Sequence, residues 1–244
     1  MQIDALALRM RPRGPLEAAD LGARLGQDAA FSVYACYAVV YLPVVALAFA
    51  SFEIAAWLPT LVLFWAKPWL DRTILFVLSR AAFGQRTTPR QLWQAQRQVW
   101  WQQLLLTWTW RRLSPWRSFT QPAYQLEGLP LGSIRQRVKQ LRGRNAGSAM
   151  LITAAFLTAE TCLAITVLSL LVWFAPADAA PDLATLLFEP SNVLFEAAWA
   201  VAYAIVVGFL EPFYVAAGFA MYLNRRAELE AWDVEQELRR AFGS

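Results

Sequence analysis

The chain has 244 residues, of which 58% are hydrophobic and only 16% are charged, with a net charge of +4. A soluble globular domain is typically about 45–50% apolar and about 25% charged. The composition therefore excludes an ordinary soluble domain and predicts an integral membrane protein. The twelve tryptophans agree with this class, because tryptophan is enriched at the membrane–water interface.

Catalytic chemistry has little support in the composition. The chain contains no histidine, which is the commonest general base and the commonest metal ligand. Its two cysteines, Cys36 and Cys162, both lie in apolar runs, where a thiol acts as a small hydrophobic group. The sequence also lacks a Gly-x-Ser-x-Gly elbow, a phosphate-binding loop and a metal-ligand cluster. We therefore expect no enzymatic activity, no metal and no cofactor.

The N-terminal part of the chain is a polar arm followed by two apolar segments. Residues 1–30 contain four arginines and are too polar for a cleavable signal peptide, so we expect a cytoplasmic arm. The first predicted span is Phe31 to Ser51, close to the about 20 residues that a helix needs to cross a bilayer. The second begins near Ile54 and continues past Lys67. Residues 31–84 are thus predicted to form a transmembrane hairpin and its cytoplasmic extension.

Two further spans are predicted in the C-terminal part, Ser148 to Ala175 and Val193 to Leu223, so residues 148–223 form a second predicted hairpin. The links between paired spans carry acids and no cation, whereas the arm, the central segment and the tail hold all 22 Lys and Arg. Cytoplasmic segments of membrane proteins are enriched in these cations. The expected fold is all-α, with about four transmembrane helices in two hairpins, both termini in the cytoplasm, and a cytoplasmic or interfacial helical loop between the hairpins.

That loop, residues 85–147, begins with a segment rich in Trp and Arg. Pro89 to Leu113 contains no acid and predicts one helix, with Trp on one face and Gln on the other. Such a helix fits the membrane interface, where Trp and Arg side chains contact lipids. The alternative is that its Trp face packs on the spans of the protein itself. The candidate lipid contacts are Trp93, Arg97, Trp100, Trp101, Trp108, Arg111 and Arg112.

The remainder of the loop divides into two parts. Ser114 to Ser133 has a density of Pro and Gly that predicts an ordered loop without long helices. Ile134 to Arg144 predicts a basic helix that leads into the third span. Its five cations are typical of a segment that flanks a membrane, so we expect no nucleic-acid partner.

Glu160, Glu196 and Glu211 are the only carboxylates within the last two predicted spans. An ionised group inside a membrane is costly, so it usually faces a cavity or a partner. Glu160 and Glu211 lie roughly 18 Å from the cytoplasmic ends of their spans and are predicted to meet. They would act either as a proton or cation relay or as neutral, hydrogen-bonded structural groups. An ion pair would require Lys67 or Arg72 to reach inward.

Residues 224–244 are predicted to leave the fourth span as a charged cytoplasmic helix. Arg and Glu recur at a spacing of four residues, which stabilises a solvated helix. This helix would either stay solvated or bind the basic segment from Arg135 to Arg142. The candidate partner-docking residues are Arg225, Arg226, Glu230, Asp233 and Glu235.

Four stretches together resemble one bacterial family. They are RPRGPLEAADLG (Arg11 to Gly22), WAKPWLDRTILFVLSRAAFG (Trp65 to Gly84), WRRLSPWRSFTQPAYQLEGL (Trp110 to Leu129) and EPFYVAAGFAMYLNRRAELEAWDVEQELRR (Glu211 to Arg240). The chain is similar to the N-terminal membrane region of large bacterial proteins that end in a domain of unknown function and are encoded near MoxR-type AAA+ ATPases. The resemblance implies an inner-membrane protein and supplies no catalytic residue. Members continue past the last stretch, so we expect a shorter member or a truncated one.

Two functions fit these patterns. The first is a non-enzymatic inner-membrane scaffold, or a subunit of an envelope-associated complex, which docks a protein partner through the central loop and the tail. The partner would be the MoxR-type ATPase or another membrane protein, and membrane lipids would contact the loop. The second is a proton- or cation-coupled transporter or channel component that uses Glu160 and Glu211. Four spans are few for an autonomous transporter, so this function would require a homo-oligomer.

Overall fold

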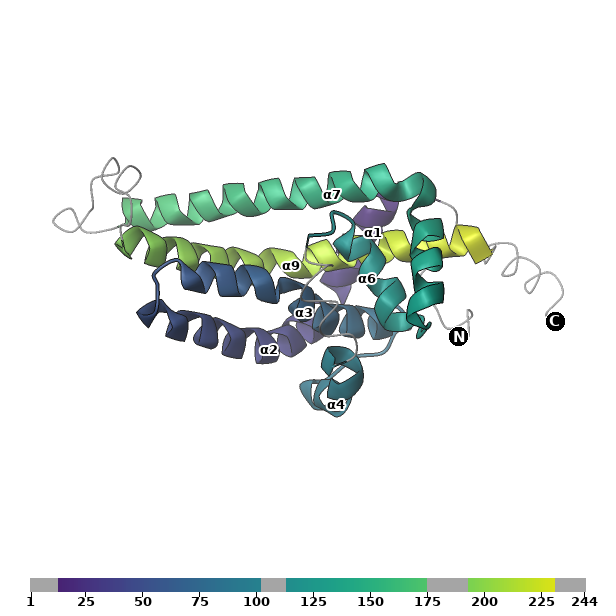
Figure 1. Cartoon of the computed structure of the whole chain (residues 1–244), viewed down its shortest axis with the longest axis horizontal. Coiled ribbons are helices and arrows are strands. Elements are labelled where there is room, and N and C mark those ends of the chain that lie inside the picture. Colours follow the sequence, from purple (N-terminus) through teal and green to yellow (C-terminus); the bar gives the residue numbers. More distant parts are fainter. Residues whose placement is uncertain (1–12, 102–112, 175–192, 231–244) are drawn as a thin grey trace.

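The computed structural model describes residues 13–101, 113–174 and 193–230, and within these ranges the chain forms helices and turns without a strand (Figure 1). Three of the described helices are long and apolar enough to cross a membrane, namely Ala30–Glu53, Gly132–Leu170 and Val193–Glu230. The predicted all-helical architecture of a membrane protein is therefore confirmed for the part of the chain that the structure describes.

Helices α2 (Ala30–Ala50) and α3 (Leu58–Ala81) lie side by side and are joined by a short turn that contains η2 (Ser51–Glu53). Helix α2 coincides with the first predicted span. Helix α3 continues through Pro68, as predicted for the second apolar segment and its extension past Lys67. It is absent from the three candidate spans because its second half is charged, yet those charged side chains are buried: Lys67, Asp71 and Arg72.

Helices α7 (Leu131–Trp173) and α9 (Val193–Glu230) pack along each other and are the longest elements. At 1.5 Å per residue, α9 rises about 57 Å, roughly twice the thickness of a bilayer core, whereas the part of α7 after Gly143 rises about 45 Å. The predicted basic helix and third span are both parts of α7, which is kinked at Gly143. The C-terminal end of α7 and the beginning of α9 lie at the same end of the molecule as η2 (Figure 1, left).

The predicted N-terminal arm is a packed helix, α1 (Pro15–Asp28), which lies against the C-terminal half of α9. The contact depends on Gly22, because a Cβ there would lie 2.2 Å from the Ala216 carbonyl oxygen. A second small residue, Gly26, faces the Ala216 side chain one turn later. Small residues spaced by four allow two helix backbones to approach closely, so α1 is an integral part of the fold.

The sequence predicted one continuous helix for the Trp-rich segment. The structure instead shows a break near its beginning. Helix α4 (Pro89–Gln94) starts with a capping box at Thr88 and ends at Ala95, whose φ of −89° and ψ of 6° leave the helical region. A π-helical turn, η3 (Arg97–Trp101), follows. Its Val99 carbonyl accepts a hydrogen bond of 2.5 Å from Arg72 Nε, so the irregular turn is held against α3 by a buried arginine.

Helix α6 (Arg117–Leu126) occupies the region predicted as a loop without long helices. It packs against α9, α7 and α3 at the end of the molecule that carries the N-terminal part of α7. Gly218 permits this approach, since a Cβ at that position would lie 2.4 Å from the Ser118 backbone carbonyl carbon. Helix α6 therefore places its first residue, Arg117, in the interior between α3 and α9.

Candidate functional site

Five ionisable side chains from four helices meet in the interior of the protein. Lys67 and Asp71 lie one turn apart on α3, Arg117 begins α6, and Glu160 and Glu211 come from α7 and α9. All five are buried, with exposed fractions of 8% or less. We call this group the ion network.

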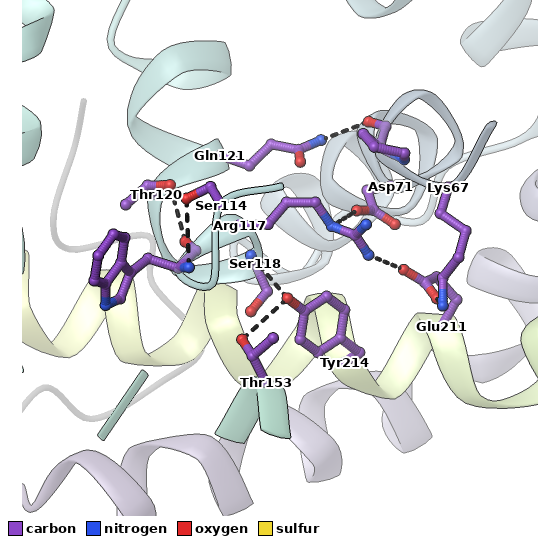
Figure 2. Close-up of polar contacts among 12 residues, drawn as sticks. Lys67, Asp71, Ser114, Arg117, Ser118, Thr120, Gln121, Thr153, Glu211 and Tyr214 are labelled. Atoms are coloured by element: carbon purple, nitrogen blue, oxygen red, sulfur yellow. Dashed lines mark hydrogen bonds and ion pairs between the residues drawn. The ribbon is translucent and has the colours of Figure 1, made fainter. Parts of the chain in front are cut away.

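Each cation of the ion network contacts two carboxylates. Lys67 Nζ donates to Glu160 Oε2 at 2.5 Å and lies 2.7 Å from Glu211 Oε2. Arg117 Nη2 donates to Glu211 Oε1 at 2.5 Å, and Arg117 Nε lies 2.9 Å from Asp71 Oδ2 (Figure 2). Glu211 thus bridges the two cations and joins all four helices through one chain of contacts.

The ion network carries an unequal number of opposite charges. Three carboxylates face two cations, so one negative charge is in excess when all five groups are ionised. Burial of Arg117 would by itself lower the pKa of its guanidinium, but Asp71 and Glu211 outweigh burial and raise that pKa above its ordinary value. Arg117 therefore remains a cation at any pH at which the protein is folded, and the imbalance lies on the carboxylates.

Neutral hydrogen bonds fix the helix that supplies Arg117. Gln121 Nε2 donates to the Pro68 carbonyl at 3.1 Å, and Gln125 Nε2 donates to the Arg72 carbonyl at 2.9 Å, which ties α6 to α3. On the opposite side, Tyr214 Oη of α9 accepts from the Ser118 backbone N–H (Figure 2). The guanidinium is also held 5.1 Å from the centre of the Tyr214 ring, where a cation–π attraction favours its charge.

Two cavities adjoin the ion network on the side where α3 and α7 face each other across α9. The Arg117 cavity, of about 200 Å³, is lined by Lys67, Arg117, Glu160 and Glu211 together with the chain at Ser114. The Glu196 cavity, of about 350 Å³, extends along the apolar halves of the same helices towards Glu196. Phe64, Leu157 and Glu160 line both cavities. Glu160 therefore stands at the boundary between them.

The predicted intramembrane acids are only partly brought together. Glu160 and Glu211 meet as predicted from their depths, but through Lys67 rather than directly. The condition set for an ion pair, that Lys67 or Arg72 reach inward, is met by Lys67. Glu196 lies apart from the ion network, in the first turn of α9, and faces its own cavity.

Sequence reasoning missed two members of the ion network, Asp71 and Arg117. The sequence does contain a signal for Asp71, because Lys67 and Asp71 are spaced four residues apart and so share one face of a helix. It contains no such signal for Arg117, because the segment of Arg117 was predicted to be a loop outside the spans. Its place in the interior depends on the fit of α6 against Gly218, which no local pattern reveals.

The candidate lipid contacts separate into buried and exposed residues. Trp100 packs on Trp69, with 5.8 Å between ring centres, and its Nε1 donates to Thr73 Oγ1 at 2.9 Å, so this residue follows the alternative of packing on the protein itself. Trp93 and Trp101 are 61% and 65% exposed, and Arg97 is exposed beside them. Trp108, Arg111 and Arg112 lie outside the described residues.

The candidate docking residues on α9 are engaged within the protein. Arg225 pairs with Glu228, and Arg226 Nε pairs with Glu230 Oε1 at 3.0 Å. Glu230 also contacts Arg137 of α7, so the expected attraction between the charged helix and the basic segment is present at this pair. Asp233 and Glu235 lie outside the described residues.

Within residues 13–101, 113–174 and 193–230, no group of three His, Cys, Asp or Glu side chains is arranged to hold a metal ion. Cys36 and Cys162 are both free thiols. No protein-family model, no curated protein and no solved structure matches the chain. Functional inference therefore depends on the ion network, the two cavities and the exposed surface.

Proposed function

We propose that the protein is a non-enzymatic membrane subunit, a scaffold with a rigid platform at the cytoplasmic face and a separate docking surface for a protein partner on the same face. The observation that carries this proposal is the way α1, α6 and the N-terminal part of α7 surround the C-terminal half of α9 (Figure 1). Helix α9 is about 27 Å longer than a bilayer core is thick, and these elements pack around its C-terminal half. We call these elements the platform. A protein that served only as a membrane anchor would not need the platform.

The ion network supports a rigid link between the platform and the spans. It connects α6 of the platform to α3, α7 and α9 through four ion pairs. Buried ion pairs contribute little net stability over an apolar core, but they disfavour alternative arrangements, since each alternative leaves a charge buried without its partner. A force exerted on the platform by a partner would thus be transmitted to the spans.

The proposed topology has four spans in two hairpins, α2 with α3 and α7 with α9. Its support is that the η2 turn lies at the same end as the facing ends of α7 and α9 (Figure 1). Helix α3 serves as the fourth span because its charged half faces the interior of the protein. The cations concentrate at the other end, and the positive-inside rule then assigns that end, with both termini, to the cytoplasm of the bacterial inner membrane.

The docking surface is proposed to be the exposed part of α4 and η3, centred on Trp93 and Trp101 beside Arg90 and Arg97. Exposed tryptophans with adjacent arginines are typical of energetically important interface residues. The charged residues on α9 are weaker candidates, since they pair within the protein. On the basis of the resemblance to the bacterial family described above, the partner is proposed to be an ATPase of the MoxR type or another membrane protein.

Affinity purification from native membranes tests this proposal. The tagged full chain should retain one protein in a fixed ratio, and Trp93→Ser with Trp101→Ser should release it. Trp173→Ser is a matched control, because Trp173 is 85% exposed and is the last residue of α7, whose C-terminal end lies away from α4 (Figure 1). A partner lost equally with Trp173→Ser, or the absence of any stoichiometric partner, would contradict the proposal.

A further inference from the structure

Glu160 differs from the other carboxylates of the ion network in its contacts. Glu211 contacts both cations and is 2% exposed, whereas the one ion pair of Glu160 is made through Oε2 to Lys67. Among the described residues, no donor forms a hydrogen bond to Glu160 Oε1. The side chain is nevertheless 8% exposed and lines both cavities. An oxygen without a donor therefore sits in a nearly closed, cavity-facing position.

A scaffold function does not explain why the ion network contains three carboxylates and only two cations. A buried charge without compensation is strongly disfavoured, and a carboxyl group in that situation takes up a proton. Glu211 already pairs with two cations, and Asp71 is 1% exposed and lines neither cavity. Glu211 lines the Arg117 cavity alone, so Glu160 is the one carboxylate of the three that lines both cavities.

We propose that Glu160 is a proton-exchange site between the two cavities and that the ion network forms a proton pathway. A hydronium ion in one cavity transfers its proton to Glu160 Oε1, and a water molecule is left behind. The proton then returns to water in the other cavity, and the carboxylate again pairs with Lys67. No bond other than O–H forms or breaks, and Glu211 keeps Lys67 in place while Glu160 is neutral.

The size and position of the cavities suit this pathway. Both cavities, of about 200 and 350 Å³, are large enough to admit water molecules next to Glu160. Between Glu196 and Tyr214, which line opposite ends of the two cavities, α9 rises about 27 Å, close to the thickness of a bilayer core. The pathway therefore covers the distance that a proton must travel to cross the membrane.

A proton fits the ion network better than a metal cation does. A monovalent or divalent metal ion requires several oxygen ligands around one point. The three carboxylates instead contact Lys67 or Arg117, and the described residues hold no metal-ligand cluster. The charged and titratable groups that face Glu160 or its cavities are Lys67, Asp71, Arg117, Glu211, Glu196, Tyr41, Tyr203 and Tyr214.

Proton flux into proteoliposomes tests the proposal. Purified full-length chain is reconstituted with an internal pH-sensitive dye, and a potassium gradient with valinomycin drives proton entry. The wild-type chain should acidify the interior faster than protein-free liposomes do, and Glu160→Gln should lose this excess. Glu53→Gln makes the same chemical change at an exposed residue in the η2 turn and should conduct like the wild type.

Infrared spectroscopy separates loss of the pathway from loss of the fold. As the pH is lowered, the folded wild-type chain should gain the carbonyl band of a protonated, buried carboxyl group, and folded Glu160→Gln should lack that band. Wild-type liposomes no leakier than protein-free ones, or a band that persists in Glu160→Gln, would overturn the proposal. So would a flux that follows a sodium gradient instead of the proton gradient. None of these results bears on the docking of a partner, so the scaffold proposal is tested separately.

Discussion

Replacing Lys67 with methionine measures the cost of leaving the buried carboxylates of the ion network without one of their two cations. The substitution keeps the length of the side chain but removes the cation that joins Glu160 to Glu211. Three carboxylates would then face Arg117 alone, and the excess of negative charge would double. Removing one partner of a buried ion pair costs about 3–5 kcal/mol. For a chain of this size that loss corresponds to a fall in Tm of roughly 6–20 °C.

The double variant Lys67→Met with Glu160→Gln restores the original excess of one negative charge. It should therefore be more stable than the sum of the two single variants predicts, by at least about 1 kcal/mol, because residues in direct contact are coupled. Thermal unfolding in detergent, followed by tryptophan fluorescence, provides the four values of the cycle. Additive effects within about 0.5 kcal/mol would refute the reasoning, since uncoupled residues do not share a network.

Four further substitutions test the packing of the described helices. Gly218→Ala places a Cβ 2.4 Å from the Ser118 backbone and should lower the free energy of unfolding by about 1–3 kcal/mol, measured by thermal unfolding. Gly147→Ala is the control. It lies at an exposed helical position with no atom within 4 Å of the added Cβ, so its effect should be neutral or slightly stabilising. Trp100→Phe removes the hydrogen bond to Thr73 and should cost about 1 kcal/mol. Glu230→Gln weakens partly exposed ion pairs and should cost less than about 1 kcal/mol. Equal effects of the two glycine substitutions, or a larger loss from Glu230→Gln than from Trp100→Phe, would contradict the packing described.

The sequence predicted the long membrane helices well. Helices α2 and α9 consist of apolar runs without a cation in their membrane-spanning part, and such runs define spans without any tertiary information. The proximity of Glu160 and Glu211, which both contact Lys67, also followed from counting residues along two antiparallel helices. These features are local or depend only on regular helix geometry, so pattern and spacing are sufficient to predict them.

The platform could not be predicted because its contacts join residues far apart in the chain. Gly22 contacts Ala216, and Ser118 contacts Gly218, in both cases through the absence of a Cβ atom. A glycine in isolation gives no sign of which backbone approaches it. The same reason explains Arg117, whose role in the ion network depends on that fit. The break after α4 is a further tertiary effect, because Arg72 binds the Val99 carbonyl of the irregular turn.

The arrangement of the helices across the membrane is tested most directly by cysteine labelling in intact cells. Cys36 and Cys162 would be replaced by serine, and single cysteines introduced at Ile54, which is 79% exposed beside the η2 turn, and at Ser133, exposed near the start of α7. A membrane-impermeant maleimide should modify Ile54→Cys from outside the inner membrane and Ser133→Cys only after lysis. Modification of both positions from the same side would contradict the account.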